Sequence, residues 1–339
     1  MPKLSAKDVV NLGNFFLENV KKMCIRMLLN FRRYFFSRSQ LFNTQHSYEH
    51  DNLKLSLPST APKEFSIISF NTLTRWYYHW GWHVRECHKD WRFRKRMLHD
   101  MLSSFNADVI CLQEINAPTF EEDFGHFIRQ IGYGVVVQKR KGKDGRFTMV
   151  NATCFRLSKF SVEWENHRSR ALILGLREKE SEEFIVIINV HLKGGPNEED
   201  TRLSQLKSSL CKISKFLGSN GKSVHTTPVV ISGDFNCSSE SASHQFLKKS
   251  GEYSRGHDFS SFDHCFSEGN SPISFCAKGS ACCIDFIYVI KSILEVGYVL
   301  DNLPERRKSV ALKTQLPNHF NPSDHLPVGC ILKLVELEW

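Results

Sequence analysis

Short apolar runs, each followed by polar residues, recur along this chain from about residue 64 to near its C-terminus. Runs of about four to eight β-branched and aromatic residues predict buried strands. Functional side chains collect where such strands emerge from a sheet. The runs and their polar endings are Phe65–Phe70 with Asn71, Val109–Leu112 with Gln113 and Glu114, Phe184–Val190 with His191, Pro228–Ser232 with Gly233–Asn236, and Ile284–Tyr288 with the later Ser323–Pro327. So many similar endings predict one shared site.

Helical periodicity alternates with these strands, which predicts an α/β domain. Helices are expected at Trp91–Phe105, around Thr119–Ile131, at Asp200–Leu217 and near Ser241–Ser250. Further strands are expected near Gly134–Gln138, Ala152–Phe155 and Ala171–Leu176, with a last one at Val328–Val335. We also expect Ile284–Ile290 and Leu294–Leu300 to pair, and Gly251–Ser280 to be mostly loop.

The first 63 residues differ from the rest of the chain. Residues 20–38 hold six Lys or Arg among Met, Leu, Ile and Phe, and no acidic residue. Three interpretations stay open: a helix packed on the domain, an organellar targeting segment, or a basic helix on an anionic membrane surface. Ser56–Lys63 is rich in Pro, Ser and Thr, which is typical of a linker. We therefore divide the chain into a basic extension with linker, 1–63, and one main domain, 64–339.

Charge and cysteine content narrow the class of protein. The formal net charge of +9 favours polyanionic partners, either nucleic acid or an anionic membrane face. The 11 cysteines are odd in number and form no CxxC pair, which indicates reduced thiols without disulfide partners in an intracellular protein. We expect a cytoplasmic location, with the mitochondrion or another organelle as the alternative if the extension is a targeting segment.

Four carboxylates stand among the polar endings: Glu114, Asp234, Asp285 and Asp324. Gathered in one buried site they would repel one another unless a cation held them. Oxygen ligands suit Mg²⁺, with Mn²⁺ as an alternative. Glu114 lies just past a buried run and is the expected primary ligand, and Asn71 would orient a phosphate oxygen or a metal-bound water.

The pattern Gly233-Asp234-Phe235-Asn236 is the most specific of the polar endings. Asp234 can take a proton from an attacking water, and Asn236 can hold that water or the metal. His191 and His325, if protonated, can straddle a phosphate and stabilise its transition state. No G-x-S-x-G elbow and no P-loop occur, which argues against serine-nucleophile and P-loop chemistry. Divalent-metal phosphoester hydrolysis is the chemistry predicted.

Six blocks in this order resemble the endonuclease/exonuclease/phosphatase superfamily over about residues 64–336. The blocks are Ser69-Phe70-Asn71, Leu112-Gln113-Glu114, Asn189-Val190-His191-Leu192, Ser232–Asn236, Ile284–Ile287 and Ser323–Pro327. The resemblance implies a four-layer α/β sandwich, with two packed mixed β-sheets flanked by helices.

Finer motifs resemble the branch of the carbon-catabolite-repression deadenylases, nocturnin and the angel proteins. They are Trp91-x-x-Arg94-Lys95, His191-Leu192-Lys193 with Arg202 and Gln205, and Leu316-Pro317-Asn318 before Pro322–Pro327. Lys193 matches the motif of nocturnin best, whereas Pro196 is closer to the motif of the angel proteins. The motifs therefore do not decide between these subfamilies.

The resemblance implies roles for the site residues. Mg²⁺ would bind at Glu114 with Asn71, Asp234 would be the general base with Asn236 beside it, His191 would contact the scissile phosphate, and Asp285 and Asp324 would organise His325 and any second metal. Arg94, Lys193 and Arg202 would contact substrate. The implied activity is hydrolysis of RNA at a 3′ end. The alternatives are a small phosphorylated metabolite such as a dinucleotide, or, with less motif support, a lipid headgroup.

An aromatic and basic insert lies between Asn71 and Trp91 and includes Trp80 and Trp82. Aromatic faces beside cations suit base stacking on a single strand, although a loop packed on the domain or at a membrane interface remains the alternative. The basic run at 139–146 is a solvated hairpin or an RNA contact. A non-catalytic RNA-binding module is the rival from another class, and the retained carboxylates and histidines argue against it.

Overall fold

The computed structural model describes residues 55–77, 84–139, 148–249, 251–254, 257–259, 261–266 and 271–335. The basic segment 20–38, Trp80, Trp82 and residues 140–147 of the basic run lie outside these residues. Among the helices of the described part, none combines the length and apolarity that crossing a bilayer requires. The cysteines of this part are unbridged.

The first sheet has six strands. Their order is β15 (Leu294–Val299), β16 (Val328–Leu334), β1 (Glu64–Asn71), β2 (Val109–Asn116), β4 (Met149–Arg156) and β3 (Tyr133–Val137). β1 and β2 are parallel, and the other neighbours are antiparallel. This sheet is therefore mixed, as the resemblance implied.

The second sheet also has six strands and a similar plan. Their order is β11 (Asp263–His264), β14 (Asp285–Val289), β8 (Val229–Asp234), β7 (Phe184–His191), β6 (Ala171–Glu178) and β5 (Phe160–His167). β7 and β8 are parallel, and the remaining pairs are antiparallel. In each sheet a parallel pair at the centre is joined by a helical crossover, so the polar ends of both pairs reach the same edge.

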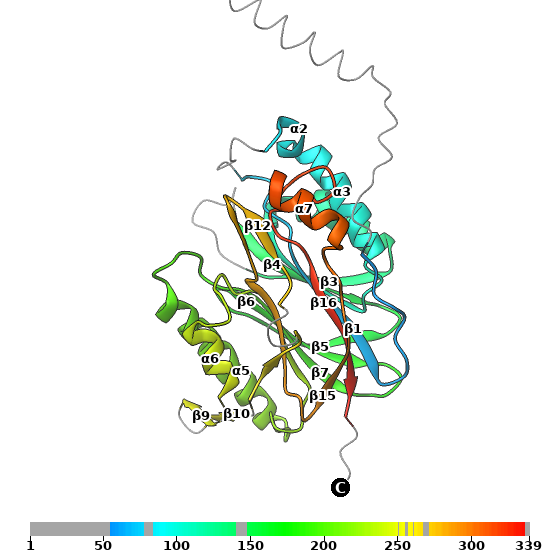
Figure 1. The fold of residues 1–339 in the computed structure, drawn as a ribbon. Coiled ribbons are helices and arrows are strands. Elements are labelled where there is room, and N and C mark those ends of the chain that lie inside the picture. The colour runs from blue at the N-terminus through cyan, green and yellow to red at the C-terminus, as the bar shows by residue number, and fades with distance from the viewer. Residues whose placement is uncertain are drawn as a thin grey trace, which may run out of the picture. The chain divides into compact units, whose positions relative to one another are not determined.

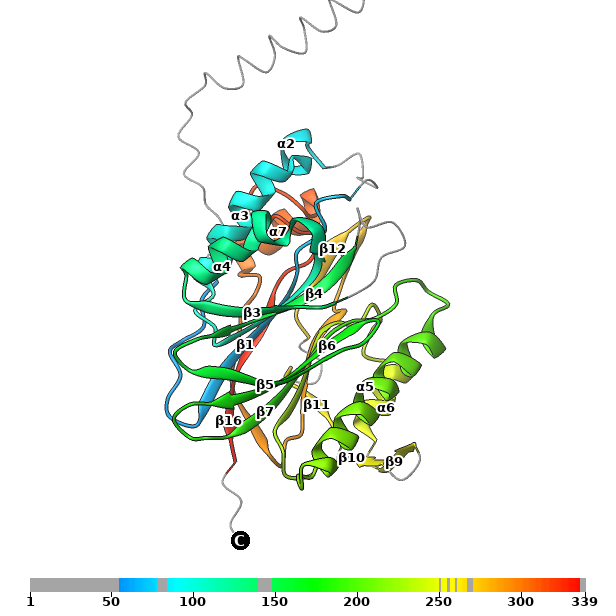
Figure 2. The same cartoon turned by 180° about the vertical axis from the view of Figure 1, so that it is seen from behind.

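Helices cover the outer faces of the two packed sheets (Figures 1 and 2). On the first sheet lie α3 (Trp91–Ser104), α4 (His126–Gln130) and α7 (Glu305–Thr314), and on the second lie α5 (Glu199–Ser219) and α6 (Ala242–Lys248). Short turns of helix complete the set at α2 (Glu86–Lys89), η1 (Ala117–Thr119) and η2 (Glu121–Gly125). The helix–sheet–sheet–helix order confirms the predicted four-layer fold.

Side chains of the central strands alternate between the two faces of the first sheet. Phe65 and Ile67 of β1 join the core shared with the second sheet, whereas Ile68 and Phe70 join the core under the helices. The same alternation places Asn71 at the inner face. The inner face is thus where the end of β1 meets the second sheet.

A bulge breaks this alternation in β2. The pairing register with β4 shifts between Leu112 and Ile115, and Glu114 between them has a φ of 60°. A bulge re-aims the side chain that it carries, and positive φ in a non-glycine residue costs free energy. Because of it, Glu114 lies at the site while Ile115 returns to the core under the helices.

Several predicted elements need correction. The strands at 284–290 and 294–300 exist but do not pair with each other, because the chain crosses there from β14 in one sheet to β15 in the other. Segment 251–280, predicted to be mostly loop, holds short strands instead: β9 (Gly251–Ser254), β10 (His257–Phe259), β11, β12 (Phe275–Ala277) and the start of β13 (Ser280–Cys282). The helix around 119–131 is divided among η1, η2 and α4.

Two buried leucines lie at the start of the described residues, one just before the predicted linker and one within it. Leu55 and Leu57 pack in the core under α3, and the Leu57 N–H bonds to the Phe105 carbonyl at 3.0 Å. Packed residues of the domain therefore begin before Glu64, and the division at residue 63 stays a prediction.

Candidate active site

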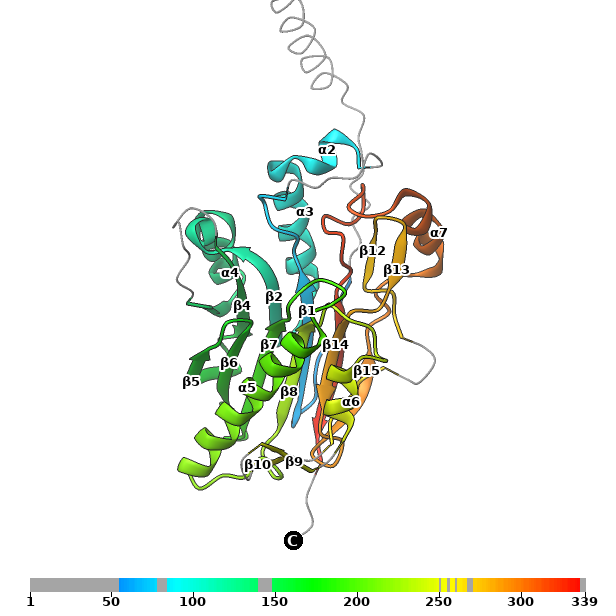
Figure 3. The same cartoon turned by 90° about the vertical axis from the view of Figure 1, so that its left-hand side faces the viewer.

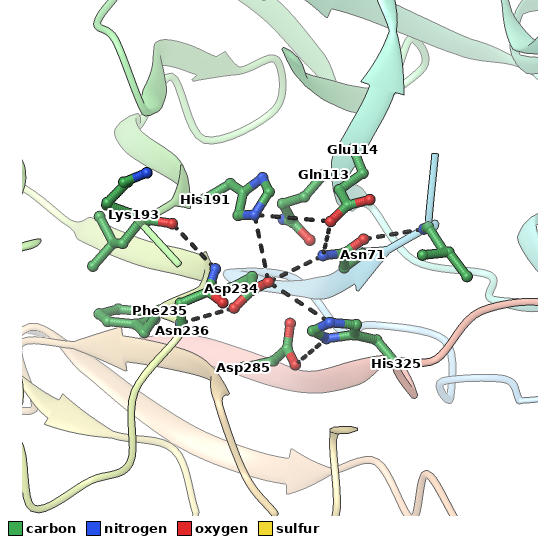
Figure 4. A network of polar contacts seen from close by, with 12 residues as sticks. Asn71, Gln113, Glu114, His191, Lys193, Asp234, Phe235, Asn236, Asp285 and His325 are labelled. Atoms are coloured by element: carbon green, nitrogen blue, oxygen red, sulfur yellow. Dashed lines mark hydrogen bonds and ion pairs between the residues drawn. The ribbon is translucent and has the colours of Figure 1, made fainter. Parts of the chain in front are cut away.

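Asn71 connects carboxylates from the two sheets. Its Nδ2 donates to Glu114 Oε1 at 3.3 Å and to Asp234 Oδ2 at 3.0 Å. Its Oδ1 accepts the Leu73 N–H at 3.0 Å, which fixes which end of the amide faces the carboxylates. Figure 4 shows this amide between the carboxylates of Glu114 and Asp234.

Glu114 is held as an ionised carboxylate. Burial raises its pKa, but His191, the Thr74 N–H and His325 together keep the pKa below its ordinary value. The Thr74 N–H bonds to Oε2 at 3.0 Å, so both oxygens are fixed in place. An anchored anionic oxygen donor is what a hard divalent cation needs.

Gly233 allows β8 to approach β7 closely next to the site. Its φ is 148°, and a Cβ there would lie 1.9 Å from the Val190 carbonyl oxygen. Asp234 follows, with Oδ1 accepting the Asn236 N–H at 2.8 Å, and Asn236 Nδ2 bonds to the Leu192 carbonyl at 3.1 Å. The glycine therefore sets the backbone that carries Asp234 into the space between the sheets.

Asp234 lies between two imidazoles. Its Oδ2 is 3.7 Å from Nε2 of His191 and 3.7 Å from Nε2 of His325, and His191 Nε2 is also 4.0 Å from Glu114 Oε1. Burial and the neighbouring Asp285 raise the pKa of Asp234, while the two imidazoles oppose that rise. A carboxylate with a raised pKa accepts a proton more readily than an exposed one.

His325 is oriented by Asp285. Its Nδ1 is 2.8 Å from Asp285 Oδ2, and both side chains are buried. Burial lowers the pKa of His325, but Asp285 and Asp234 raise it well above its ordinary value. The imidazole is therefore a cation with Nε2 directed at Asp234, the form that suits an anionic substrate.

Asp324 and Asp285 act on His325 in different ways. The hydrogen bond to His325 comes from Asp285, and Asp324 lies in the fields of Glu114 and Arg94. Burial raises the pKa of Asp324, which His325 opposes. Asp324 therefore acts on the imidazole through its charge, which helps to raise the pKa of His325.

Two arginines predicted to touch substrate have structural partners. Arg94 is 1% exposed and donates to the carbonyls of Pro322, Thr72 and Leu73. Arg202 is 3% exposed and donates to the carbonyls of Lys193 and Gly195. A buried guanidinium whose N–H groups bond to backbone carbonyls cannot contact a substrate in this conformation. The prediction that Arg94 and Arg202 bind substrate is therefore wrong, and both are positioning residues.

The remaining predicted contacts are Lys193, Trp80 and Trp82. Lys193 lies just past His191, partly buried, with its N–H on Gln205 Oε1 at 3.0 Å. Figure 4 shows its side chain pointing away from the carboxylates. Trp80 and Trp82 lie outside the described residues, so their contacts stay predictions.

A buried network behind the site escaped the sequence analysis. Gln113 Nε2 donates to Asn189 Oδ1 at 2.9 Å, and Asn189 Nδ2 donates to the Leu112 and Ala152 carbonyls. Ser323 Oγ donates to the Asn71 carbonyl at 2.6 Å and accepts the His325 N–H at 3.1 Å. The family-like sequence blocks include Gln113, Asn189 and Ser323. No local pattern showed that the side chains of these residues connect the blocks by hydrogen bonds.

The donor set fits a divalent cation. Asp234, Asp285 and His325 offer ligand atoms within 4.8 Å of one another. His325 is held protonated, so the oxygen donors are the suitable ligands. Asp285 Oδ1 is buried and has no hydrogen-bond partner among the described residues. Buried carboxylate oxygens that lack hydrogen-bond donors are typical of a site that binds a cation such as Mg²⁺.

Comparisons with known proteins follow the same branch, although no family model matches the chain. The Ccr4 3′-5′-exoribonuclease subunit of the CCR4-Not complex from Candida albicans is 25% identical over 324 residues, 78% of this chain and 40% of that protein. Protein angel homolog 2 from Bos taurus is 28% identical over 208 residues, 55% of this chain and 37% of that protein. This chain therefore spans less than half the length of these relatives.

Solved structures share the fold. ANGEL2, described as a 2′,3′-cyclic phosphatase and bound to adenosine-2′,3′-vanadate, matches with a TM-score of 0.69 and 24% identity, over 80% of this chain and 96% of that chain. The human nocturnin catalytic domain with bound sulfate matches with a TM-score of 0.60 and 18% identity, over 80% and 94%. Each aligns over four-fifths of this chain.

Proposed function

We propose that this chain, a member of the endonuclease/exonuclease/phosphatase superfamily on the branch of the Ccr4, nocturnin and angel proteins, hydrolyses phosphoester bonds of RNA at a 3′ end. The observation that carries the proposal is the assembly of Glu114, Asp234, His191 and His325 around the Asn71 amide. These side chains come from opposite sheets, so their meeting is a property of the fold and not of one loop.

The residues divide the chemistry among them. Glu114 would hold Mg²⁺ (or Mn²⁺), which when bound would supply positive charge that stabilises the phosphate as negative charge develops on it. Asn71 would lie beside the cation and orient the Glu114 and Asp234 carboxylates through its Nδ2. Asp234 accepts the proton of the attacking water, and Asn236 fixes the backbone next to that carboxylate. His191 and the protonated His325 flank Asp234 and stabilise the phosphate charge. Asp285 keeps His325 oriented and protonated.

RNA is favoured over a small metabolite by the named activities of the sequence relatives and by the net charge of +9. The alternative is a phosphatase or phosphodiesterase on a small phosphorylated molecule, and the ANGEL2 structure, described as a cyclic phosphatase, supports it. A lipid headgroup has no support among these relatives. We keep the basic extension as a proposed separate segment, and we make no proposal for a membrane surface.

The experiment compares substrates directly. Purified protein with Mg²⁺ is incubated with labelled oligo(A), oligo(U), mixed-sequence RNA, a 2′,3′-cyclic phosphate RNA end and NADPH. Progressive shortening of an oligonucleotide from its 3′ end supports the exoribonuclease. Consumption of only the cyclic phosphate or the dinucleotide supports the alternative.

Substrate affinity distinguishes RNA from a small metabolite independently of turnover. The affinity of the Asp234→Asn protein is measured for oligonucleotides of about two to twelve residues across a salt series. Single-strand tracking predicts affinity that rises with length and falls steeply with salt, because each neutralised phosphate releases counterions. Length-independent affinity would favour the small metabolite.

A further inference from the structure

The β12–β13 hairpin carries a lysine at its tip. Ala277 pairs with Ser280, and the two residues between them, Lys278 and Gly279, have φ values of 54° and 79°. A two-residue turn of this kind favours Asn-Gly, and lysine at positive φ costs free energy. The turn thus presents a long cationic side chain where its backbone prefers a smaller residue.

The hairpin is attached to the segment that carries His325. Phe275 bridges to His325 in a short antiparallel contact, and their rings are 5.2 Å apart in an edge arrangement. The Cys276 N–H bonds to the Asp324 carbonyl at 3.0 Å, and the Leu326 N–H bonds to the Ser274 carbonyl at 2.7 Å. Figure 3 shows the hairpin at the end of the domain where α2 and α7 lie. The tip is therefore fixed relative to the reacting groups.

Lys278 spans from this hairpin to the loop after β1. Its ammonium lies 5.7 Å from the ring centroid of Tyr77, six positions past Asn71 in the chain. A cation and an aromatic face together make a pair suited to a nucleotide, with the ring for a base and the ammonium for a phosphate.

The charge of Lys278 acts on the site. A hydrogen bond with Tyr77 and the fields of Asp324 and Glu114 raise its pKa, so the ammonium stays charged at neutral pH. Unlike Arg94, Lys278 is exposed and projects from the surface. A cation in the field of clustered carboxylates favours the approach of an anionic substrate to them.

We propose that Lys278 and Tyr77 form a subsite for the nucleotide next to the scissile bond, with Lys278 binding a second phosphate of the substrate. The inference rests on the proposed function and adds to it a preference for substrates with two neighbouring phosphates. Tyr77 receives the base or ribose of that nucleotide.

The test uses three dinucleotides with the same single phosphodiester: ApA, pApA and ApAp. Michaelis constants and binding constants are measured for the wild type and for Lys278→Met, which keeps the stem and removes the charge. Lys278→Arg keeps the charge, and Tyr77→Phe keeps the ring. Lys333→Met is the matched control, because Lys333 is exposed at the opposite end of the same domain, paired with Glu64.

The wild type should bind pApA or ApAp at least about tenfold more tightly than ApA, and the favoured one identifies the side of the second phosphate. Lys278→Met should abolish that preference and reduce the salt slope for the favoured dinucleotide by about one. Lys278→Arg, Tyr77→Phe and Lys333→Met should retain the preference. Circular dichroism establishes that each variant is folded.

Other outcomes separate the two proposals. If Lys278→Met keeps the preference, or weakens ApA as much as pApA and ApAp, the subsite is wrong even when ApA is hydrolysed. If the wild type hydrolyses none of the three but shows a binding preference that requires Lys278, the subsite stands and the proposed function fails.

Discussion

Gln113 and Asn189 hydrogen-bond directly to each other across the two sheets, with 2.9 Å between Nε2 and Oδ1. Each side chain is fully buried. Gln113 precedes Glu114, and Asn189 lies two residues before His191, so this bond sets how the two catalytic edges face each other.

Replacing Asn189 by Ala should destabilise the protein by about 3 kcal/mol, because Gln113 Nε2 and the Leu112 and Ala152 carbonyls lose buried partners. Urea denaturation measures the free energy of unfolding. Asn220→Ala is the control, since its amide bonds to a carbonyl at an exposed helix end. Equal effects of the two substitutions would contradict the importance of the buried bond.

Glu114→Gln should reduce turnover by more than about 10²-fold while leaving the fold intact, because the amide keeps an acceptor for the Thr74 N–H and loses the charge. Calorimetric titration with Mn²⁺ should show weaker binding. The melting temperature in metal-free buffer should fall slightly, since the surroundings of Glu114 lower its pKa and so favour its ionised form in the folded state. Full turnover in Mg²⁺ would exclude Glu114 as the main ligand. Glu240→Gln, on the exposed surface, serves as the control.

Asp234→Asn should lose turnover and keep substrate binding, because it removes the proton acceptor with little change of shape. His325→Ala should lower turnover by about 10²-fold or more, the usual effect of one oriented electrostatic contact. Single-turnover rates and equilibrium binding to oligo(A) separate the two effects. Near-normal rates at saturating Mg²⁺ in either variant would refute the assigned roles.

Arg94→Lys should lower kcat more than it changes KM. The Arg94 guanidinium bonds to the Thr72 and Leu73 carbonyls and to the Pro322 carbonyl, and a single ammonium cannot reproduce these donors. The segment that carries His325 should therefore move relative to Asn71. Steady-state kinetics give the split. A rise in KM alone, with kcat unchanged, would restore Arg94 as a substrate contact.

The free energy of unfolding should fall as pH drops below about 6.5. Burial, together with His264 and Lys248, lowers the pKa of His244 to about 3, against opposing effects of the Cys237 backbone and Glu199. Above pH 6.5 the residue is neutral in both states. Between pH 6.5 and 3 the unfolded chain binds a proton that the native state does not, which costs about 1.4 kcal/mol per pH unit.

The measurement is chemical denaturation of the wild type and His244→Phe between pH 4 and 8, chosen as roughly the range on both sides of an ordinary histidine pKa. The variant loses the bond to Tyr288 at every pH, so it should be less stable than the wild type near pH 8. Its shallower pH slope should narrow or reverse that difference in free energy of unfolding toward pH 4. Parallel slopes would show that His244 does not titrate on unfolding.

The sequence predicted the alternation of strands and helices because apolar runs and helical periodicity are local properties, whereas the arrangement in four layers was implied by the family resemblance. It missed β5, whose exposed and half-buried positions hide an edge strand, and α7, where only Arg307 and Ala311 are buried. It also paired the runs that form β14 and β15, because nearness in sequence resembles a hairpin and nothing local records a change of sheet.

The site followed the same rule. The polar residues that follow the apolar runs predicted Glu114, Asp234 and His325 as site residues, because a carboxylate or imidazole after an apolar run is a local signal. Whether Asp285 or Asp324 bonds to His325 depends on tertiary register, and so does the burial of Arg94. Lys278 gave no local signal, since a lysine beside a glycine is common in turns.

The pairing of β1 with β16 has a consequence for synthesis on the ribosome. Glu64 pairs with Lys333 and Ser69 with Val328, so the first of the described strands to be synthesised gains its antiparallel neighbour only from the last of them. A nascent chain that already contains β1 and β2 displays an unpaired apolar edge until residue 334 emerges from the exit tunnel. Such an edge invites pairing with other chains, so production of the protein in cells should depend on chaperones that bind unfinished chains.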